Sequence, residues 1–185
     1  MGDTNVRHGR WEAGRTRAPA ARREAFATLA DHHLASAYRL AGVILGDPAD
    51  AEDATHDAVV TAWRSFGSLR DPARFEQWFS RILVNVCRDR LRKRRRTPVV
   101  ELDLGRAVAG RDPIHRVDDR VVLDRAFERL TADQRIVVAL RFWADLTIDD
   151  IAERVGVPAG TVKSRLHTAI GRLRGALADD KEAVR

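Results

Sequence analysis

The chain has 185 residues, which is enough for one ordinary domain or two small helical ones. No run approaches the roughly 18 apolar residues of a membrane span, and the first 20 residues lack the apolar stretch of a secretory signal. We therefore expect a cytoplasmic protein without membrane insertion. A single cysteine, Cys87, excludes an internal disulfide and a multi-cysteine zinc site. The formal net charge of +6 favours a polyanionic partner.

Five stretches follow one another along the chain. Residues 1–21 mix Gly, Arg, Thr and Pro without periodicity, which predicts a disordered basic tail. Residues 22–97 and 119–178 have helical periodicity, and residues 179–185 read as a short charged tail. Residues 98–118, with two prolines and two glycines, predict a linker. Because no segment alternates as strands do, the predicted fold class is all-α, with two small helical domains joined by a flexible linker.

Capping residues mark the expected helix starts. A side-chain oxygen at the N-cap accepts a hydrogen bond from a backbone N–H that the helix itself leaves unpaired. Proline is tolerated directly after the cap, and a Gln three residues later completes a capping box. The predicted starts are Asp47 before Pro48, Asp71 before Pro72, Thr131 with Gln134, and Thr147 before Asp149 and Asp150.

The segment from Asp47 to Asp57 is acidic and contains no Lys or Arg. Its acids are Asp47, Asp50, Glu52, Asp53 and Asp57. Such a surface repels phosphate and suits a protein partner with basic residues. A merely solvated acidic helix is the alternative.

The next predicted helix, residues 75–96, has the opposite charge. Its apolar residues lie broadly on one face and are expected in the core: Phe75, Trp78, Phe79, Ile82, Leu83 and Val86. Arg81, Arg88 and Arg92 recur on the other face with Asn85 beside them. Residues 88–96 hold seven cations and one acid, which attracts nucleic acid in a salt-dependent manner. A solvated charge run without a specific role is the alternative.

Residues 146–166 predict a helix-turn-helix. Its first helix carries the apolar stripe Ile148, Ile151, Ala152 and Val155. Gly156 ends that helix because glycine takes a positive φ without steric cost. A second helix starting between Pro158 and Thr161 would enter the major groove of DNA.

At 100° per residue the second helix has a buried and an outward side. The residues expected to be buried are Val162, Leu166, Ala169, Ile170, Leu173 and Leu177. Ser164, His167 and Thr168 face outward and suit base edges. Phosphate contacts are expected from Lys163, Arg165, Arg172 and Arg174 and from the backbone N–H groups of Gly160 and Thr161. An amphipathic helix with a solvated basic face is the alternative.

Together these segments resemble the extracytoplasmic-function (ECF) group of bacterial RNA polymerase sigma factors, from about Arg23 to Leu177. The resemblance lies in residues 50–63, in 75–92 with Phe75, Trp78, Ile82, Asn85, Asp89 and Arg92, in 130–135, and most strongly in 160–167. The chain departs from many members at Thr168 and Ile170, where they carry arginine, and at His56, where glutamine is common.

The resemblance implies a role for each domain. Residues 22–97 would be the region 2 domain, which binds the clamp helices of core RNA polymerase through Asp50, Glu52, Asp53, His56 and Asp57. The same domain would bind the −10 promoter element, opened near residues 67–74, through Arg74, Arg81, Asn85, Arg88 and Arg92. Residues 119–178 would be the region 4 domain, which packs on the polymerase flap and binds the −35 element through Gly160, Thr161, Lys163, Ser164, Arg165, His167, Thr168, Arg172 and Arg174.

The resemblance also implies control by an anti-sigma factor. We expect no catalytic residues, no metal and no cofactor, and therefore a transcription factor that is not an enzyme. Glu52, Asp53, His56 and Asp57 have i, i+4 spacing, but no further ligand converges on them. The main rival is a helix-turn-helix regulator that acts on duplex operators without binding polymerase. A second rival is an RNA-binding or scaffold protein that uses the arginine run.

Overall fold

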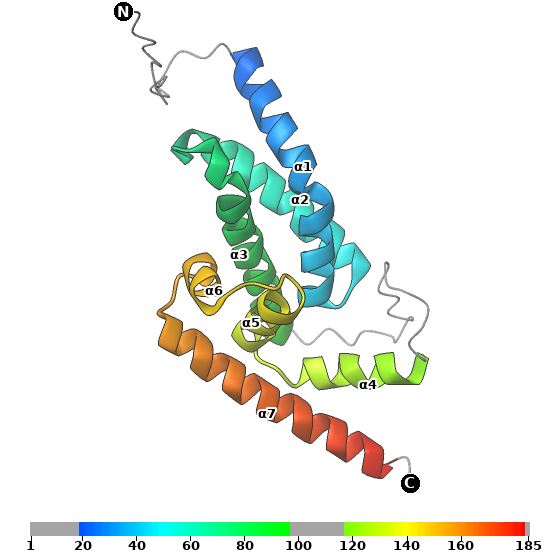
Figure 1. Ribbon diagram of the computed structural model, residues 1–185. Helices are drawn as coiled ribbons and strands as arrows, with labels where there is room; N and C mark the ends of the chain where they lie inside the picture. The colour runs from blue at the N-terminus through cyan, green and yellow to red at the C-terminus, as the bar shows by residue number, and fades with distance from the viewer. Residues whose placement is uncertain (1–18, 97–116, 184–185) are drawn as a thin grey trace, which may run out of the picture.

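The computed structural model describes residues 19–96 and 117–183, and all regular elements within these ranges are helical (Figure 1). The helices are α1 (Pro19–Leu45), α2 (Pro48–Ser65), α3 (Phe75–Arg96), α4 (Val117–Glu128), α5 (Ala132–Phe142), α6 (Ile148–Val155) and α7 (Ala159–Ala183), with the 3₁₀ turns η1 (Phe66–Ser68) and η2 (Pro72–Arg74) between α2 and α3. The prediction of an all-α fold is confirmed. None of the helices in these ranges is long and apolar enough to cross a membrane.

In the N-terminal half, residues 19–96, helices α1, α2 and α3 pack against one another. The face of α2 in this core consists of fully buried alanines, Ala51, Ala54, Ala58 and Ala62. Small side chains let the helices approach closely and bury their backbones. Near the N-terminus of α1, aromatic rings pack together in the core. The ring centroid of Phe26 lies 5.3 Å from that of Trp63 in an edge-to-face contact.

In the C-terminal half, residues 117–183, helix α7 packs against α4, α5 and α6. The buried residues of α5, including Ile136, Val137 and Leu140, meet Ile151 of α6 and Val162 of α7 in the core. The long α7 therefore holds the shorter helices of this half together.

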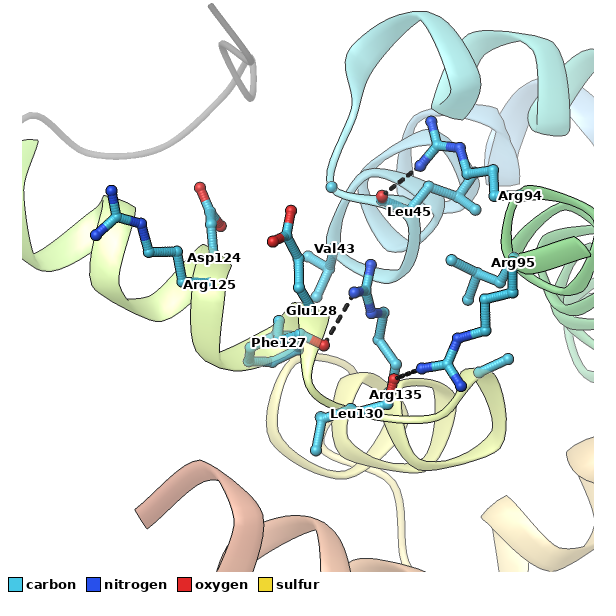
Figure 2. Close-up of a pocket in the computed structure, with 13 residues that line it drawn as sticks. Val43, Leu45, Arg94, Arg95, Asp124, Arg125, Phe127, Glu128, Leu130 and Arg135 are labelled. Carbon is cyan, nitrogen blue, oxygen red and sulfur yellow. Dashed lines mark hydrogen bonds between the residues drawn. The ribbon is translucent and has the colours of Figure 1, made fainter. Parts of the chain in front are cut away.

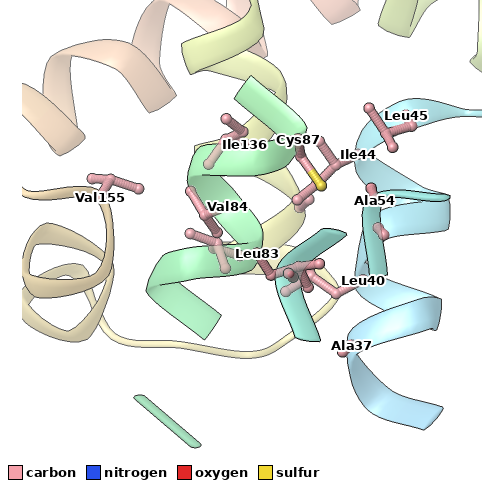
Figure 3. Packing of buried hydrophobic residues seen from close by; sticks show 14 of the residues in the cluster. Ala37, Leu40, Ile44, Leu45, Ala54, Leu83, Val84, Cys87, Ile136 and Val155 are labelled. Carbon is pink, nitrogen blue, oxygen red and sulfur yellow. The ribbon is translucent and has the colours of Figure 1, made fainter. Parts of the chain in front are cut away.

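The two halves share one hydrophobic core. Helix α3 packs against α5 and α6, and α1 packs against α5. Figure 3 shows Ile136 of α5 beside Cys87 of α3 and Ile44 of α1, with Val155 on the far side of Val84. The sequence predicts two domains, but it does not predict that one lies against the other.

The expected caps are present. Asp47 accepts a hydrogen bond from the backbone N–H of Asp50 at 2.9 Å, and Asp71 accepts one from Ala73 at 3.0 Å, which starts η2. Thr131 and Gln134 form the predicted capping box. A second box joins Thr147 to Asp150.

The helices reach further than the sequence predicts. Helix α1 begins three residues inside the predicted tail 1–21, α4 begins at Val117 inside the predicted linker 98–118, and α7 continues to Ala183 inside the predicted tail 179–185. Alanine and charged residues continue a helix at little cost, so charge alone does not mark its end. The rest of those tails and of the linker lies outside the described residues.

Candidate nucleic-acid interface

The helix-turn-helix is built from α6, a short turn and α7. Gly156 has φ +70°, and its N–H donates to Ala152 at 2.9 Å, so the helix ends in the left-handed conformation that the sequence predicts. After the turn, the carbonyl of Pro158 accepts from the N–H groups of Thr161 and Val162 at 2.9 and 3.2 Å. These bonds form the first turn of α7.

The two sides of α7 match the angular prediction. Val162, Leu166 and Ala169 are buried, and the other three apolar residues of the predicted stripe, Ile170, Leu173 and Leu177, are half-buried. Lys163, Ser164, His167 and Thr168 are exposed on the opposite side, as are Gly160 and Arg174, while Thr161 is half-buried. An exposed polar strip beside cations is the arrangement that reads a DNA groove.

Two of the predicted phosphate-binding arginines of α7 are engaged within the C-terminal half. Arg165 forms an ion pair with Asp133 of α5, with Nη2 and Oδ2 3.2 Å apart. Arg172 donates to the side-chain oxygen of Gln134 at 2.9 Å. Both guanidinium groups are thus held against α5, which sets their position beside the polar strip.

On α3, the predicted −10 residues Arg81 and Asn85 are exposed, and Arg88 donates to the side-chain oxygen of Asn85 at 2.7 Å. Arg88 also donates to Asp133 at 2.9 Å, and Arg92 lies 3.7 Å from the same carboxylate. The basic face of α3 therefore points at the C-terminal half. Arg74, just before α3, forms an ion pair with Glu153 of α6 at 2.7 Å.

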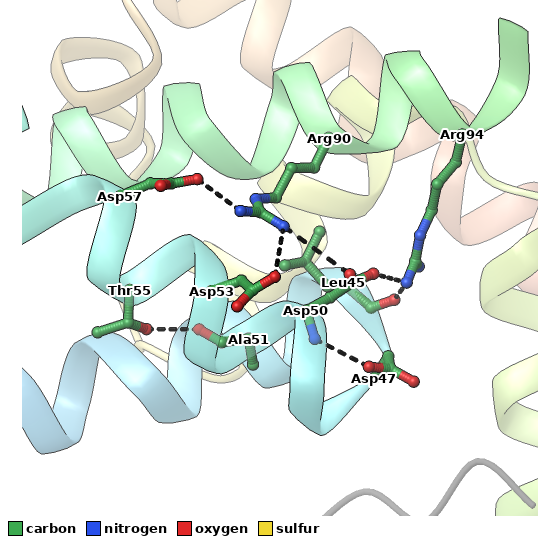
Figure 4. A network of polar contacts seen from close by, with 9 residues as sticks. All are labelled: Leu45, Asp47, Asp50, Ala51, Asp53, Thr55, Asp57, Arg90 and Arg94. Carbon is green, nitrogen blue, oxygen red and sulfur yellow. Dashed lines mark hydrogen bonds and ion pairs between the residues drawn. The ribbon is translucent and has the colours of Figure 1, made fainter. Parts of the chain in front are cut away.

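Ion pairs with arginines of α3 occupy part of the acidic face of α2, which the sequence does not predict. Arg90 of α3 lies 2.5 Å from Asp57, 3.5 Å from Asp53 and 3.8 Å from Asp50, and Arg94 also pairs with Asp50 (Figure 4). The two remaining residues of the predicted polymerase interface, Glu52 and His56, are exposed on the same helix. The acidic segment 47–57 itself contains no Lys or Arg, so these pairs depend on α3 packing beside it.

The arginine run at the end of α3 also has a structural role that the sequence does not indicate. Arg94 and Arg95 donate to the carbonyls of Leu45 and Leu130, and Arg135 of α5 donates to Phe127 at 2.9 Å (Figure 2). These carbonyls lie at or just after the ends of α1 and α4, where fewer helical N–H groups are available to the last carbonyls. The three arginines line a cavity of about 550 Å³ between the halves.

Three side chains at this interface were not predicted as functional: Asp133, Gln134 and Arg154. Asp133 and Arg154 lie where the halves meet. Asp133 belongs to the segment 130–135 that carries part of the family resemblance, but the sequence assigns neither residue a role. Gln134 was predicted only as a cap.

Burial raises the pKa of the Cys87 thiol to about 12, which makes it a core residue and not a nucleophile. At the start of α6, the hydrogen bond from the Thr147 hydroxyl lowers the pKa of Asp150.

A helix-turn-helix with an exposed polar strip, joined to a second helical unit with a cationic helix, defines a DNA-binding protein. Residues 29–97 match the family Sigma-70 region 2, and residues 126–175 match the family Sigma-70, region 4. Over 151 residues the chain is 38% identical to the ECF RNA polymerase sigma factor SigM of Mycobacterium tuberculosis, covering 82% of this chain and 76% of that protein. It is 33% identical over 150 residues to the RNA polymerase sigma-E factor of Streptomyces avermitilis, covering 81% of both.

Solved structures have the same fold. The sigma factor RpoE from Bartonella quintana, in complex with the anti-sigma factor NepR, superposes with a TM-score of 0.64 at 25% identity, covering 83% of this chain and 96% of that one. CnrH, in complex with the cytosolic domain of CnrY, superposes with a TM-score of 0.59 at 25% identity, covering 85% and 90%. The chain belongs to the ECF group of RNA polymerase sigma factors.

Proposed function

We propose that each of the surfaces described above binds a different partner of this sigma factor. The acidic face of α2 binds core RNA polymerase, the basic face of α3 binds the −10 element, and α7 binds the −35 element. The observation that carries this proposal is the exposed strip of Ser164, His167 and Thr168 on α7, flanked by cations. As a member of its family, the chain directs promoter-specific initiation of transcription. It acts in the cytoplasm, where its DNA template lies, and is not itself an enzyme.

The polymerase contact is tested best at the exposed residue Glu52. Reversing the charge of Asp53 or Asp57 would also break their ion pairs with Arg90. A loss of activity would then not distinguish lower stability of the fold from weaker binding of polymerase. Glu52→Lys leaves those pairs intact and should reduce co-purification with core polymerase and run-off transcription together. Glu24→Lys, a charge reversal at an exposed position of α1, is the matched control. Equal retention of polymerase by both variants would contradict the assignment of α2.

The −35 contact is tested on α7. His167→Ala and Thr168→Ala should change the preferred −35 sequence across a promoter library. Each lost base contact should reduce the free energy of discrimination between bases by about 1–3 kcal/mol. Arg165→Ala should weaken binding to all sequences and reduce its salt dependence, since phosphate contacts carry no sequence information. An unchanged −35 preference in the first two variants would refute the assignment of this strip.

A second proposal concerns regulation. Both solved relatives described above are complexes, and in one of them the partner is an anti-sigma factor. We propose that a protein of this class also controls the present chain. Co-purification of the tagged chain from its native host tests this, and it should bring down a small regulatory protein that core polymerase displaces. Recovery of the chain with polymerase alone, under non-inducing conditions, would contradict the proposal.

A further inference from the structure

A cavity of about 220 Å³ lies where α1, α3 and the segment 143–154 of the C-terminal half meet. None of its described lining residues belongs to the surfaces proposed above to bind polymerase or DNA. Apolar side chains form much of the lining, with Leu40, Phe79 and Leu83 buried and Trp143 partly exposed. An apolar cavity of about 150 Å³ is enough to bind benzene, so this cavity has room for a ring that carries a small polar group.

Arg154 of α6 supplies unused hydrogen-bond donors at this cavity. The residue is 9% exposed, and among the described residues no group accepts from its buried Nε and Nη1 atoms. Its Nη2 lies 3.5 Å from the carboxylate of Glu76, whose side chain is 66% exposed, so this ion pair is weak. A buried guanidinium that lacks acceptors is unfavourable. Because Arg154 lines the cavity, a rotation of its long side chain would turn these donors towards an acceptor placed there.

The charges around the cavity indicate the charge of its ligand. Arg39 and Arg154 bring two positive charges and Glu76 brings one negative charge, which leaves an excess of one positive charge with His33 neutral. A monoanion balances this excess, whereas a phosphate dianion would exceed it. A planar guanidinium also matches a carboxylate, to which it can donate two parallel hydrogen bonds. The lining therefore suits a carboxylate joined to an apolar body.

We infer that this cavity binds a small organic monocarboxylate whose apolar body is about the size of a benzene ring. The carboxylate accepts hydrogen bonds from Arg154, and the apolar body packs against Phe79 and Leu83. Because the lining comes from both halves of the chain, the bound ligand contacts both of them. The site does not depend on which surfaces bind polymerase and DNA.

The first test uses benzoate as the probe and the full chain, with binding measured by ligand-observed NMR titration. Benzamide has the same ring without the charge, and it should bind about ten- to hundredfold more weakly, because a hydrogen bond to a charged group is lost. Acetate, which lacks the ring, and inorganic phosphate should also bind more weakly than benzoate. Benzoate should raise Tm as its concentration increases, since it binds the folded chain. No binding of benzoate, or equal binding of benzoate and any of the other three probes, would overturn the inference.

The second test removes the guanidinium. Arg154→Met replaces it with an apolar side chain, and benzoate should then bind about ten- to hundredfold more weakly. The control is Arg64→Met, which loses one positive charge at an exposed position of α2 outside the cavity. The control should bind benzoate as the wild-type chain does. Equal affinities of the two variants for benzoate would overturn the role of Arg154.

Two further variants keep the test decisive if Arg154→Met folds poorly. Glu76→Gln removes a charge that repels the ligand and competes for Arg154, so benzoate should bind about two- to fivefold more tightly. Unchanged or weaker binding would contradict the inference. Trp143 lines the cavity, so benzoate should change the tryptophan fluorescence of the wild-type chain, and Trp143→Phe should lose most of this change. A change of the same size in Trp143→Phe would place the ligand elsewhere and overturn the site.

Discussion

Gln134 links the start of α5 to the DNA-binding helix α7, and its truncation gives a prediction of defined size. The residue is 7% exposed, and its Oε1 accepts from the backbone N–H of Thr131 at 3.0 Å and from Arg172 at 2.9 Å. Gln134→Ala removes both bonds. The neutral bond contributes about 1 kcal/mol, and the bond to the guanidinium contributes about 1.5 kcal/mol because water reaches Arg172. We expect a loss of about 2–3 kcal/mol in the free energy of unfolding.

Urea unfolding followed by far-UV circular dichroism measures this loss. For a chain of this size it corresponds to a fall of about 5–10 °C in Tm. The control is Gln134→Glu, which keeps an acceptor for both donors and suits the third position of a capping box, so its change should stay below about 1 kcal/mol. Equal losses in the two variants, or a loss below about 0.5 kcal/mol for the alanine, would refute this account of α5.

Four other predictions follow from single positions. Leu83→Ala, at 1% exposure in the shared core, should cost about 2–5 kcal/mol in urea unfolding. Gly156→Ala should lower stability by about 1 kcal/mol in the same assay, because φ is +70° there and a Cβ would meet no clash. Cys87 should react with a thiol reagent at about pH 8 only after unfolding, since its pKa is raised to about 12. Asp150 has a lowered pKa, so its stabilisation is present above the ordinary Asp pKa and is lost as the pH falls through the folded value; Asp150→Asn should flatten the acid limb of stability against pH.

Local features of this chain are readable from its sequence. The caps at Asp47, Thr131 and Thr147 and the glycine stop at Gly156 depend on residues within a few positions of each other, so spacing alone predicts them. The exposed strip of α7 follows from helical periodicity for the same reason. The motif at residues 160–167 identified the family correctly.

Contacts between distant segments are not readable in this way. The pairing of Arg90 with Asp57, and of Arg88 with Asp133, joins residues that are 33 and 45 positions apart. A run of arginines predicts attraction to nucleic acid from charge alone, yet Arg94 and Arg95 donate to backbone carbonyls at helix ends. Only the packing of the helices decides which cation meets phosphate and which meets the protein.

Reconstituted run-off transcription tests the central claim most directly. Purified chain is added to core RNA polymerase from the native host, with sheared genomic DNA as template, and the transcript starts are mapped. We expect starts that appear only when the chain is present and that share sequence elements near −10 and −35. Transcripts that do not depend on the chain, or the absence of transcripts although the chain is folded and bound to the polymerase, would contradict the account.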